Sequence, residues 1–198
     1  MDFSQYIIPS LWLLGITSTC LLVVRNWRVL PILLGIQYVG VFVLVGTTWP
    51  IEMAVVKLVV GWLSAAMLGL ELGKLKPAVK QGNSNSWSWI LFVLLLALFI
   101  IFGILEIAPE FAYRFLNSSY EQIIGCLLLI GMGILNLGIS ESTGEVILGL
   151  LTFLSGFEIL FASIETSAFI AGFLALCTLG IAILGSYLSV SPSLEIDQ

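Results

Sequence analysis

Histidine is absent from the 198-residue sequence, and charged residues make up only 10% of it. Without an imidazole the chain has no histidine ligand for haem or a metal and no histidine proton relay. Soluble domains carry charge on about a quarter of their residues. So little charge, together with 60% hydrophobic residues, indicates an integral membrane protein. The net charge of −5 says little about partners when most residues face lipid, but the lack of a basic run or a large basic face argues against a nucleic-acid partner.

Cysteine is scarce as well, and Cys20, Cys126 and Cys177 each stand alone in an apolar segment. Their isolation favours small core residues over a disulfide or metal framework. The sequence also lacks a phosphate-binding glycine loop, a Walker motif and a nucleophile–base pair. We therefore expect no catalytic residue, no cofactor and no metal in this chain. No basic segment follows Met1, so the first span is expected to act as its own insertion signal.

Seven apolar stretches are each long enough for a membrane-spanning helix, which needs about 20 residues. Continuous apolar runs without two-residue alternation favour helices over strands. We therefore expect an all-α polytopic membrane protein. The expected spans are Tyr6–Val24, Val29–Thr47, Ile51–Leu72, Trp87–Ile107, Gln122–Ile139, Val146–Ile164 and Ala168–Ser189.

Basic residues set the expected orientation, because lysine and arginine collect on the cytoplasmic side of a membrane protein. Five of them follow the first and third spans, whereas the expected outer loops hold only Arg114. The N-terminus is therefore expected outside and the C-terminus in the cytoplasm. The five basic residues are Arg25, Arg28, Lys74, Lys76 and Lys80.

The fourth span divides the chain into two three-helix units, which then have the same orientation. The first unit is expected at residues 1–73 and the second at residues 122–198. Residues 74–121 join them through a cytoplasmic loop, the fourth span and an outer amphipathic segment, Pro109–Glu121. That segment mixes aromatic and charged residues, as segments at a membrane interface do.

Two charged residues lie well inside expected spans, Lys57 in the third and Glu158 in the sixth, whereas Glu52, Glu71 and Glu106 lie near span ends. An unpaired charge in hydrocarbon costs at least a few kcal/mol, so such residues are candidates for an ion path. Helix rise puts Lys57 roughly 9 Å and Glu158 roughly 10 Å from the outer ends of their spans. The two charges can pair if the third and sixth spans meet. Glu165, two turns beyond Glu158 on the same helix face, is the candidate outer mouth of the path.

Structural interpretations stand beside these functional ones. Lys57 can reach toward the outer headgroups along its own stem, and Glu158 can remain protonated as a hydrogen-bonded structural group. Polar residues inside spans more often bridge helices than bind substrates. Gly131 and Gly133 would let a neighbouring helix approach closely. The polar candidates for helix contacts are Gln37, Asn136 and Ser155.

The second three-helix unit carries an acid in the middle of its second span, within Phe157-Glu158-Ile159-Leu160. With its N-terminus outside and a cytoplasmic turn after its first span, this unit resembles the K subunit of complex I and the C subunit of Mrp-type antiporters. The whole chain is similar to component E of membrane-bound hydrogenases of the hydrogenase-4 and formate hydrogenlyase type. That similarity rests on the basic turn Arg25–Arg28 and the lysine in Val55-Val56-Lys57-Leu58-Val59.

The resemblance implies a subunit of a complex I-like membrane arm, next to larger antiporter-like subunits. It assigns Glu158 and Lys57 to a hydrophilic axis along which protons or sodium move. The K subunit usually has a second acid in its last span, and Ala168–Ser189 has none, so a path would need a neighbouring subunit. The implied partners are other membrane subunits and the lipid bilayer. The implied location is the inner or plasma membrane of a prokaryote, or a thylakoid or similar membrane.

Three functions remain open on the sequence. The first is an ion-translocating subunit of a redox-driven pump, a membrane-bound hydrogenase or an Mrp-type antiporter, with no catalysis of its own. The second is a structural or assembly subunit without an ion path. The third, an independent small carrier, is disfavoured because so few polar residues could line a substrate site.

Overall fold

The computed structural model describes residues 3–24, 26, 28–74, 87–114 and 119–194, and this part of the chain is helical without strands. Within this described part, a short 3₁₀ helix, Phe3–Tyr6, precedes seven α-helices. The seven are α1 (Ile7–Val23), α2 (Leu30–Val45), α3 (Ile51–Lys74), α4 (Trp87–Arg114), α5 (Tyr120–Ile139), α6 (Thr143–Ile164) and α7 (Ala168–Leu194). The expectation of an all-α chain is confirmed for these residues.

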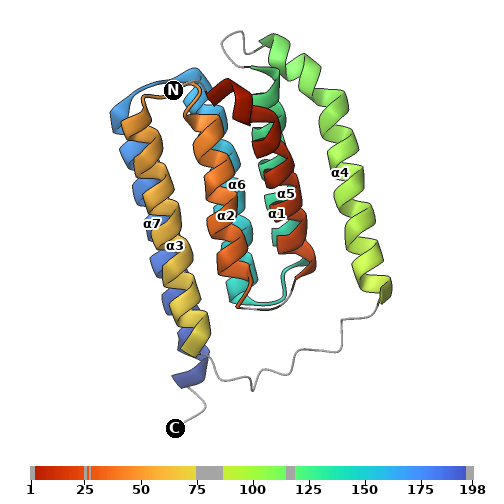
Figure 1. The fold of residues 1–198 in the computed structure, drawn as a ribbon. Helices are drawn as coiled ribbons and strands as arrows, with labels where there is room; N and C mark the ends of the chain where they lie inside the picture. The colour runs from red at the N-terminus through yellow and green to blue at the C-terminus, as the bar shows by residue number, and fades with distance from the viewer. Residues whose placement is uncertain (1–2, 25, 27, 75–86, 115–118, 195–198) are drawn as a thin grey trace.

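Five helices, α3 to α7, are long and apolar enough to cross a membrane. Helices α1 and α2 are apolar too but have 17 and 16 residues, fewer than the about 20 of a full span. Helix α4 passes its expected end at Ile107 and continues through Pro109 to Arg114. The start of the expected amphipathic segment is therefore the end of α4, which bends toward the other helices (Figure 1), as helices do at proline. Residues 115–118 of that segment lie outside the described residues.

Local sequence signals fix several helix starts. Pro31 lies in the first turn of α2. An N–H at this position would have no hydrogen-bond acceptor within the helix, so the proline costs no helical hydrogen bond. Helix α5 begins with a capping box between Ser119 and Gln122, and α6 with one between Ser142 and Glu145. Each box satisfies two backbone N–H groups that the helix itself leaves open.

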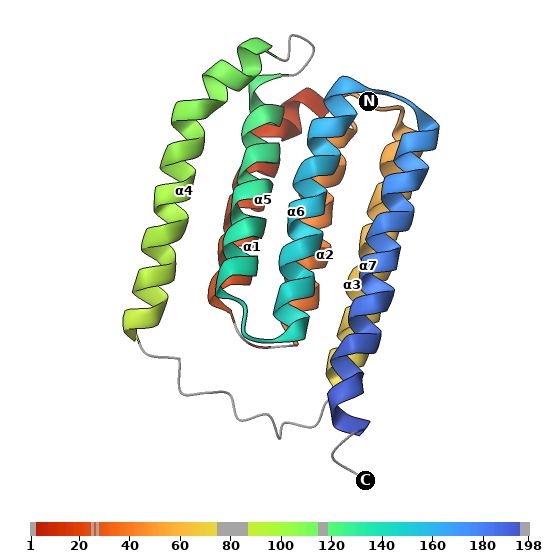
Figure 2. The same cartoon turned by 180° about the vertical axis from the view of Figure 1, so that it is seen from behind.

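The helices form two layers (Figures 1 and 2). Helices α1, α2 and α3 lie side by side in one layer, and α5, α6 and α7 lie in the other in the same order. Thus α1 packs on α5, α2 on α6 and α3 on α7, and the two helices of each pair run in the same direction. Helix α4 lies at the edge, against α5 and α1.

Two clusters of buried apolar side chains fill the space between the layers. The larger joins α1, α2 and α5, with Leu14, Leu44 and Leu129 fully buried at its centre. The smaller joins α2 to α3 and α6 and includes Leu34 and Tyr38. Leu58 of α3, the neighbour in sequence of Lys57, packs against this second cluster.

Helices α5 and α6 approach closely because glycines remove side chains from both surfaces. A β-carbon at Gly133 of α5 would stand 2.5 Å from the backbone nitrogen of Phe153. A β-carbon at Gly156 of α6 would stand 2.7 Å from the carbonyl oxygen of Cys126. Gly131 faces side chains of α4, and a β-carbon there would stand 2.9 Å from Ile100 Cγ2. The close helix approach expected at Gly131 and Gly133 is confirmed.

Alanine at Gly133 should lower the free energy of unfolding by about 1–3 kcal/mol, because α5 and α6 must separate to admit the β-carbon. Gly138, on the same helix, has open space where a β-carbon would go. Gly138→Ala should therefore be neutral, or stabilising by up to about 1 kcal/mol through helix propensity. Unfolding of the two detergent-solubilised variants measures the difference, and equal stabilities would contradict the close approach.

Candidate buried ion-pair site

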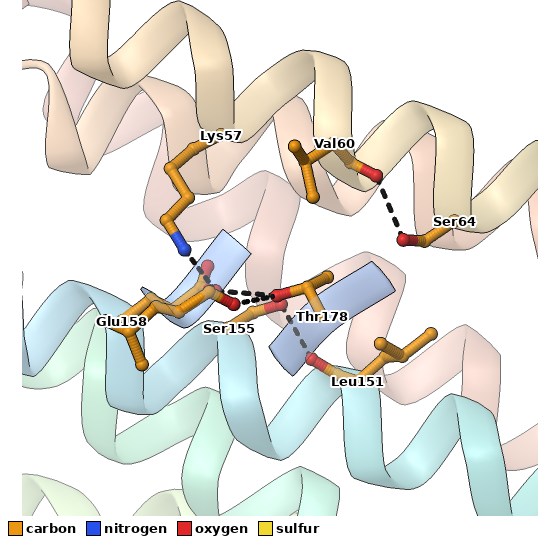
Figure 3. Close-up of polar contacts among 8 residues, drawn as sticks. Lys57, Val60, Ser64, Leu151, Ser155, Glu158 and Thr178 are labelled. Carbon is orange, nitrogen blue, oxygen red and sulfur yellow. Dashed lines mark hydrogen bonds and ion pairs between the residues drawn. The ribbon is translucent and has the colours of Figure 1, made fainter. Parts of the chain in front are cut away.

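Lys57 and Glu158 form an ion pair inside the molecule. Lys57 Nζ lies 2.5 Å from Glu158 Oε1, and the two residues are 3% and 1% exposed. They belong to helices that lie diagonally opposite each other, because α3 and α6 each pack on both α2 and α7. The pair therefore crosses the centre of the four-helix group formed by α2, α3, α6 and α7 (Figure 3).

Helix rise explains why these two residues meet. Lys57 lies six residues after α3 begins, and Glu158 lies six residues before α6 ends. The beginning of α3 and the end of α6 lie at the same end of the molecule (Figure 1), so both residues lie roughly 9 Å from it. The sequence left open whether the third and sixth spans meet. In the structure Lys57 of α3 and Glu158 of α6 do meet, and the two charges pair.

Thr178 of α7 holds the same carboxylate oxygen that Lys57 holds. Its Oγ1 lies 2.8 Å from Glu158 Oε1 and 2.9 Å from the Leu174 carbonyl oxygen, so one hydroxyl proton is shared between two acceptors. The other oxygen, Glu158 Oε2, has no hydrogen-bond partner within the described residues. One oxygen of this carboxylate is therefore committed to the ion pair, and the other can accept a proton.

The energy of such a pair is a balance of large terms. Moving a charge out of water costs several kcal/mol per ion, and the attraction between the ions offsets this cost only in close, hydrogen-bonded geometry. The short distance between Lys57 and Glu158 and the added donor Thr178 supply that geometry. Losing either charge would leave the other buried without a partner.

Glu165, the candidate outer mouth, directly follows α6 and has an exposed side chain. Its backbone carbonyl accepts a hydrogen bond from Trp49 Nε1 at 3.0 Å, and Trp49 itself is 4% exposed. This bond ties the turn between α2 and α3 to the turn between α6 and α7. Glu165 thus lies at the end of the molecule nearer to the ion pair, and the hydrogen bonds of the pair do not include it.

The three polar candidates for helix contacts are all buried. Ser155 donates to the Leu151 carbonyl of its own helix at 2.7 Å. The Asn136 side-chain oxygen Oδ1 accepts from Ser140 Oγ at the end of the same helix at 3.4 Å, and the Asn136 backbone carbonyl accepts from the same hydroxyl at 2.6 Å. Gln37 has no hydrogen bond on either amide atom within the described residues. The hydrogen bonds of Ser155 and Asn136 therefore stay within one helix and its end.

Gln122 is a helix-bridging residue that sequence reasoning missed. Its Nε2 donates to the Leu44 carbonyl at 3.0 Å and to Thr47 Oγ1, which joins the start of α5 to the end of α2. The available signal was the Ser-x-x-Gln spacing of the capping box with Ser119. It would have marked a helix start but not the contact with α2.

Tyr38 is a second residue that sequence reasoning missed. Its ring fills the space over Gly61 of α3, and the side chain is almost fully buried. Its hydroxyl lies near Ser155 and Glu158 of α6. The polar surroundings of the ion pair therefore come from α2 as well as from α3, α6 and α7.

Comparison of the chain with family models, curated proteins and solved structures found no match in any of the three. The site is therefore interpreted from its own chemistry. Among the described residues no group of three or more acidic or cysteine side chains could hold a metal ion. What the arrangement offers is a buried carboxylate that is neutralised by an ammonium and has one oxygen open to a proton.

Lys57→Met should lower the free energy of unfolding by about 3–5 kcal/mol, because it leaves the Glu158 charge buried without a partner. Adding Glu158→Leu should restore most of the loss, since a buried pair can be replaced by apolar residues at little cost. A double-mutant cycle of unfolding measurements gives the coupling energy.

The exposed pair Arg114–Glu110 is the matched control, with a 3.1 Å distance and both side chains 71% exposed. Breaking it with Arg114→Met should cost less than about 0.5 kcal/mol. A similar cost for both single substitutions would contradict the assignment of Lys57 and Glu158 as a buried pair.

Proposed function

We propose that this chain is an integral membrane subunit of an ion-translocating assembly of the complex I-like type. The assembly would be a redox-driven pump, a membrane-bound hydrogenase or an Mrp-type antiporter, and Lys57 and Glu158 would contribute to its proton or sodium path. The supporting observation is a buried ion pair among helices apolar enough to cross a membrane. Ionisable residues are costly in that environment and mark functional sites by default.

The carboxylate can act as a switch. Glu158 Oε1 is held by Lys57 and Thr178, and Oε2 has no partner within the described residues. A proton that arrives at Oε2 neutralises the carboxylate and removes most of the attraction on the Lys57 ammonium. The ammonium must then find another negative partner or release its own proton. In this proposal the ion pair is formed when Glu158 is charged and broken when Glu158 is protonated.

The orientation and location belong to the same proposal. The turn between α1 and α2, with Arg28, lies at the same end of the molecule as the end of α3, with Lys74 (Figure 1). Placing this basic end in the cytoplasm follows the rule for basic residues; Arg25, Lys76 and Lys80 lie outside the described residues. All seven helices then cross the inner or plasma membrane of a prokaryote, with Glu165 as the outer mouth and antiporter-like subunits as partners.

Glu158→Gln in the intact assembly should lower ion translocation by about tenfold or more, because the glutamine cannot exchange a proton. Acidification of inverted membrane vesicles, followed with a pH-sensitive dye, gives the rate. The amount of assembly recovered through an affinity tag on this chain gives the normalisation. Glu110→Gln, which removes an exposed acid of α4, is the control and should leave the rate unchanged.

A structural subunit without an ion path is the second candidate. The observation that favours it is the mutual neutralisation of Lys57 and Glu158, since buried ion pairs can also serve to specify one arrangement of helices. Under this alternative, Glu158→Gln and Lys57→Met leave translocation per assembly unchanged, whereas Gly133→Ala reduces the amount of assembly. A normal rate in Glu158→Gln would therefore reject the ion path.

A further inference from the structure

A groove lies between α2 and α3 at the basic end of the molecule. Its volume is about 450 Å³, within the range of roughly 300–1,000 Å³ that small-molecule sites occupy. Both helices supply its walls, because α2 begins at the end of the molecule where α3 ends (Figure 1). The lining residues are Arg28, Pro31, Ile32, Ala65, Ala66 and Gly69.

Small residues on α3 leave this groove open. A β-carbon at Gly69 would stand 3.4 Å from Pro31 Cβ, so the two helices lie close at this level without a large side chain between them. Further along α3 a large ring covers the contact between the helices. The Trp62 indole lies over Gly35, and its Nε1 donates to the Gly35 carbonyl at 3.1 Å. Trp62 precedes Gly69 by seven residues, so the groove extends roughly 10 Å along α3 before it meets the indole.

The apolar walls of the groove face away from the rest of the molecule. Ile32 of α2 is 62% exposed, and Ala66 of α3 is exposed as well. Beside them Ile36 and Trp62 also have exposed side chains. In a membrane protein such a surface is covered by lipid chains, which are as apolar as leucine. The groove therefore opens toward hydrocarbon over most of its length.

Arg28 places a positive charge at the end of the groove nearest the membrane surface. The turn before α2 fixes its position, because Asn26 Oδ1 accepts from the Arg28 N–H at 3.2 Å and the Asn26 carbonyl accepts from the Val29 N–H at 2.9 Å. The Arg28 side chain is exposed. A guanidinium is always charged, and its planar set of N–H donors matches the oxygens of a phosphate. The groove thus combines a phosphate-binding cation with an apolar wall.

We infer that this groove binds an anionic phospholipid, with the lipid phosphate on the Arg28 guanidinium and an acyl chain along Ile32 and Ala66 toward Trp62. Basic pockets between spanning helices bind anionic headgroups in this way. Inorganic phosphate would leave the apolar walls unfilled. A zwitterionic phospholipid would fill the walls but bring its own cation close to Arg28. The inference goes beyond the proposed function and does not depend on the ion path.

Lipid binding by the purified full-length chain tests the headgroup site. Native mass spectrometry of the chain in detergent, titrated with phosphatidylglycerol or with phosphatidylcholine of the same acyl chains, gives a Kd for each lipid. Phosphatidylglycerol should bind about fivefold more tightly, which is the effect of one basic residue at a membrane surface. Arg28→Gln should remove this preference, whereas Arg28→Lys should keep most of it. Arg114→Gln, at an exposed arginine of α4, is the matched control and should change neither Kd.

The apolar wall is tested separately. Ala66→Leu puts a larger side chain into the groove from an exposed position, so the helices need not move to admit it. It should weaken the binding of both lipids by about fourfold for each methylene group that it displaces from the groove. Ala168→Leu adds the same side chain at an exposed position at the start of α7. This control should leave both Kd values unchanged.

Three results would overturn the inference. The first is equal binding of the two phospholipids by the unaltered chain, and the second is an unchanged preference in Arg28→Gln. The third is displacement of phosphatidylglycerol by inorganic phosphate, which would make Arg28 part of a simple anion site. These variants leave Lys57 and Glu158 in place, so their outcome is independent of the translocation rate in Glu158→Gln.

Discussion

The attraction between Lys57 and Glu158 constrains four helices at once. It acts across the diagonal of α2, α3, α6 and α7, and neither charge can leave without exposing the other to apolar surroundings. Helices surrounded by lipid gain little from the hydrophobic effect, so polar contacts and close packing must set their register. The Trp49–Glu165 bond and the Gln122 contacts with α2 do so elsewhere in the molecule.

The helices and the depth of the two charges followed from the sequence, because run length and helix rise depend on local properties of the chain. The lateral order of helices does not, and the diagonal pairing of Lys57 with Glu158 depends on it. For the same reason the contact of Thr178 with Glu158 and the position of Tyr38 near the pair could not be predicted from the sequence. The passage of α4 through Pro109 was missed because proline more often ends a helix.

The two oxygens of Glu158 have different surroundings, and this asymmetry reconciles the structural and functional interpretations. Oε1 receives Lys57 and Thr178 and so contributes to holding the helices. Oε2 has no hydrogen-bond partner among the described residues, and it remains open to proton exchange. A group with one fixed and one open oxygen can stabilise an arrangement and still respond to protonation.

Helix α4 packs only at the edge of the molecule, yet it sets the orientation of α5, α6 and α7 relative to the first layer. Because α4 crosses once between α3 and α5, α5 starts at the same end as α1 (Figure 1). A direct connection from α3 to α5 would invert the second layer. Glu158 would then lie fifteen residues from the end at which Lys57 lies six residues deep, a mismatch of about 14 Å. The peripheral helix thus sets the relative orientation of the two layers. The ion pair can form because a single helix, rather than none or two, separates α3 from α5 in the chain.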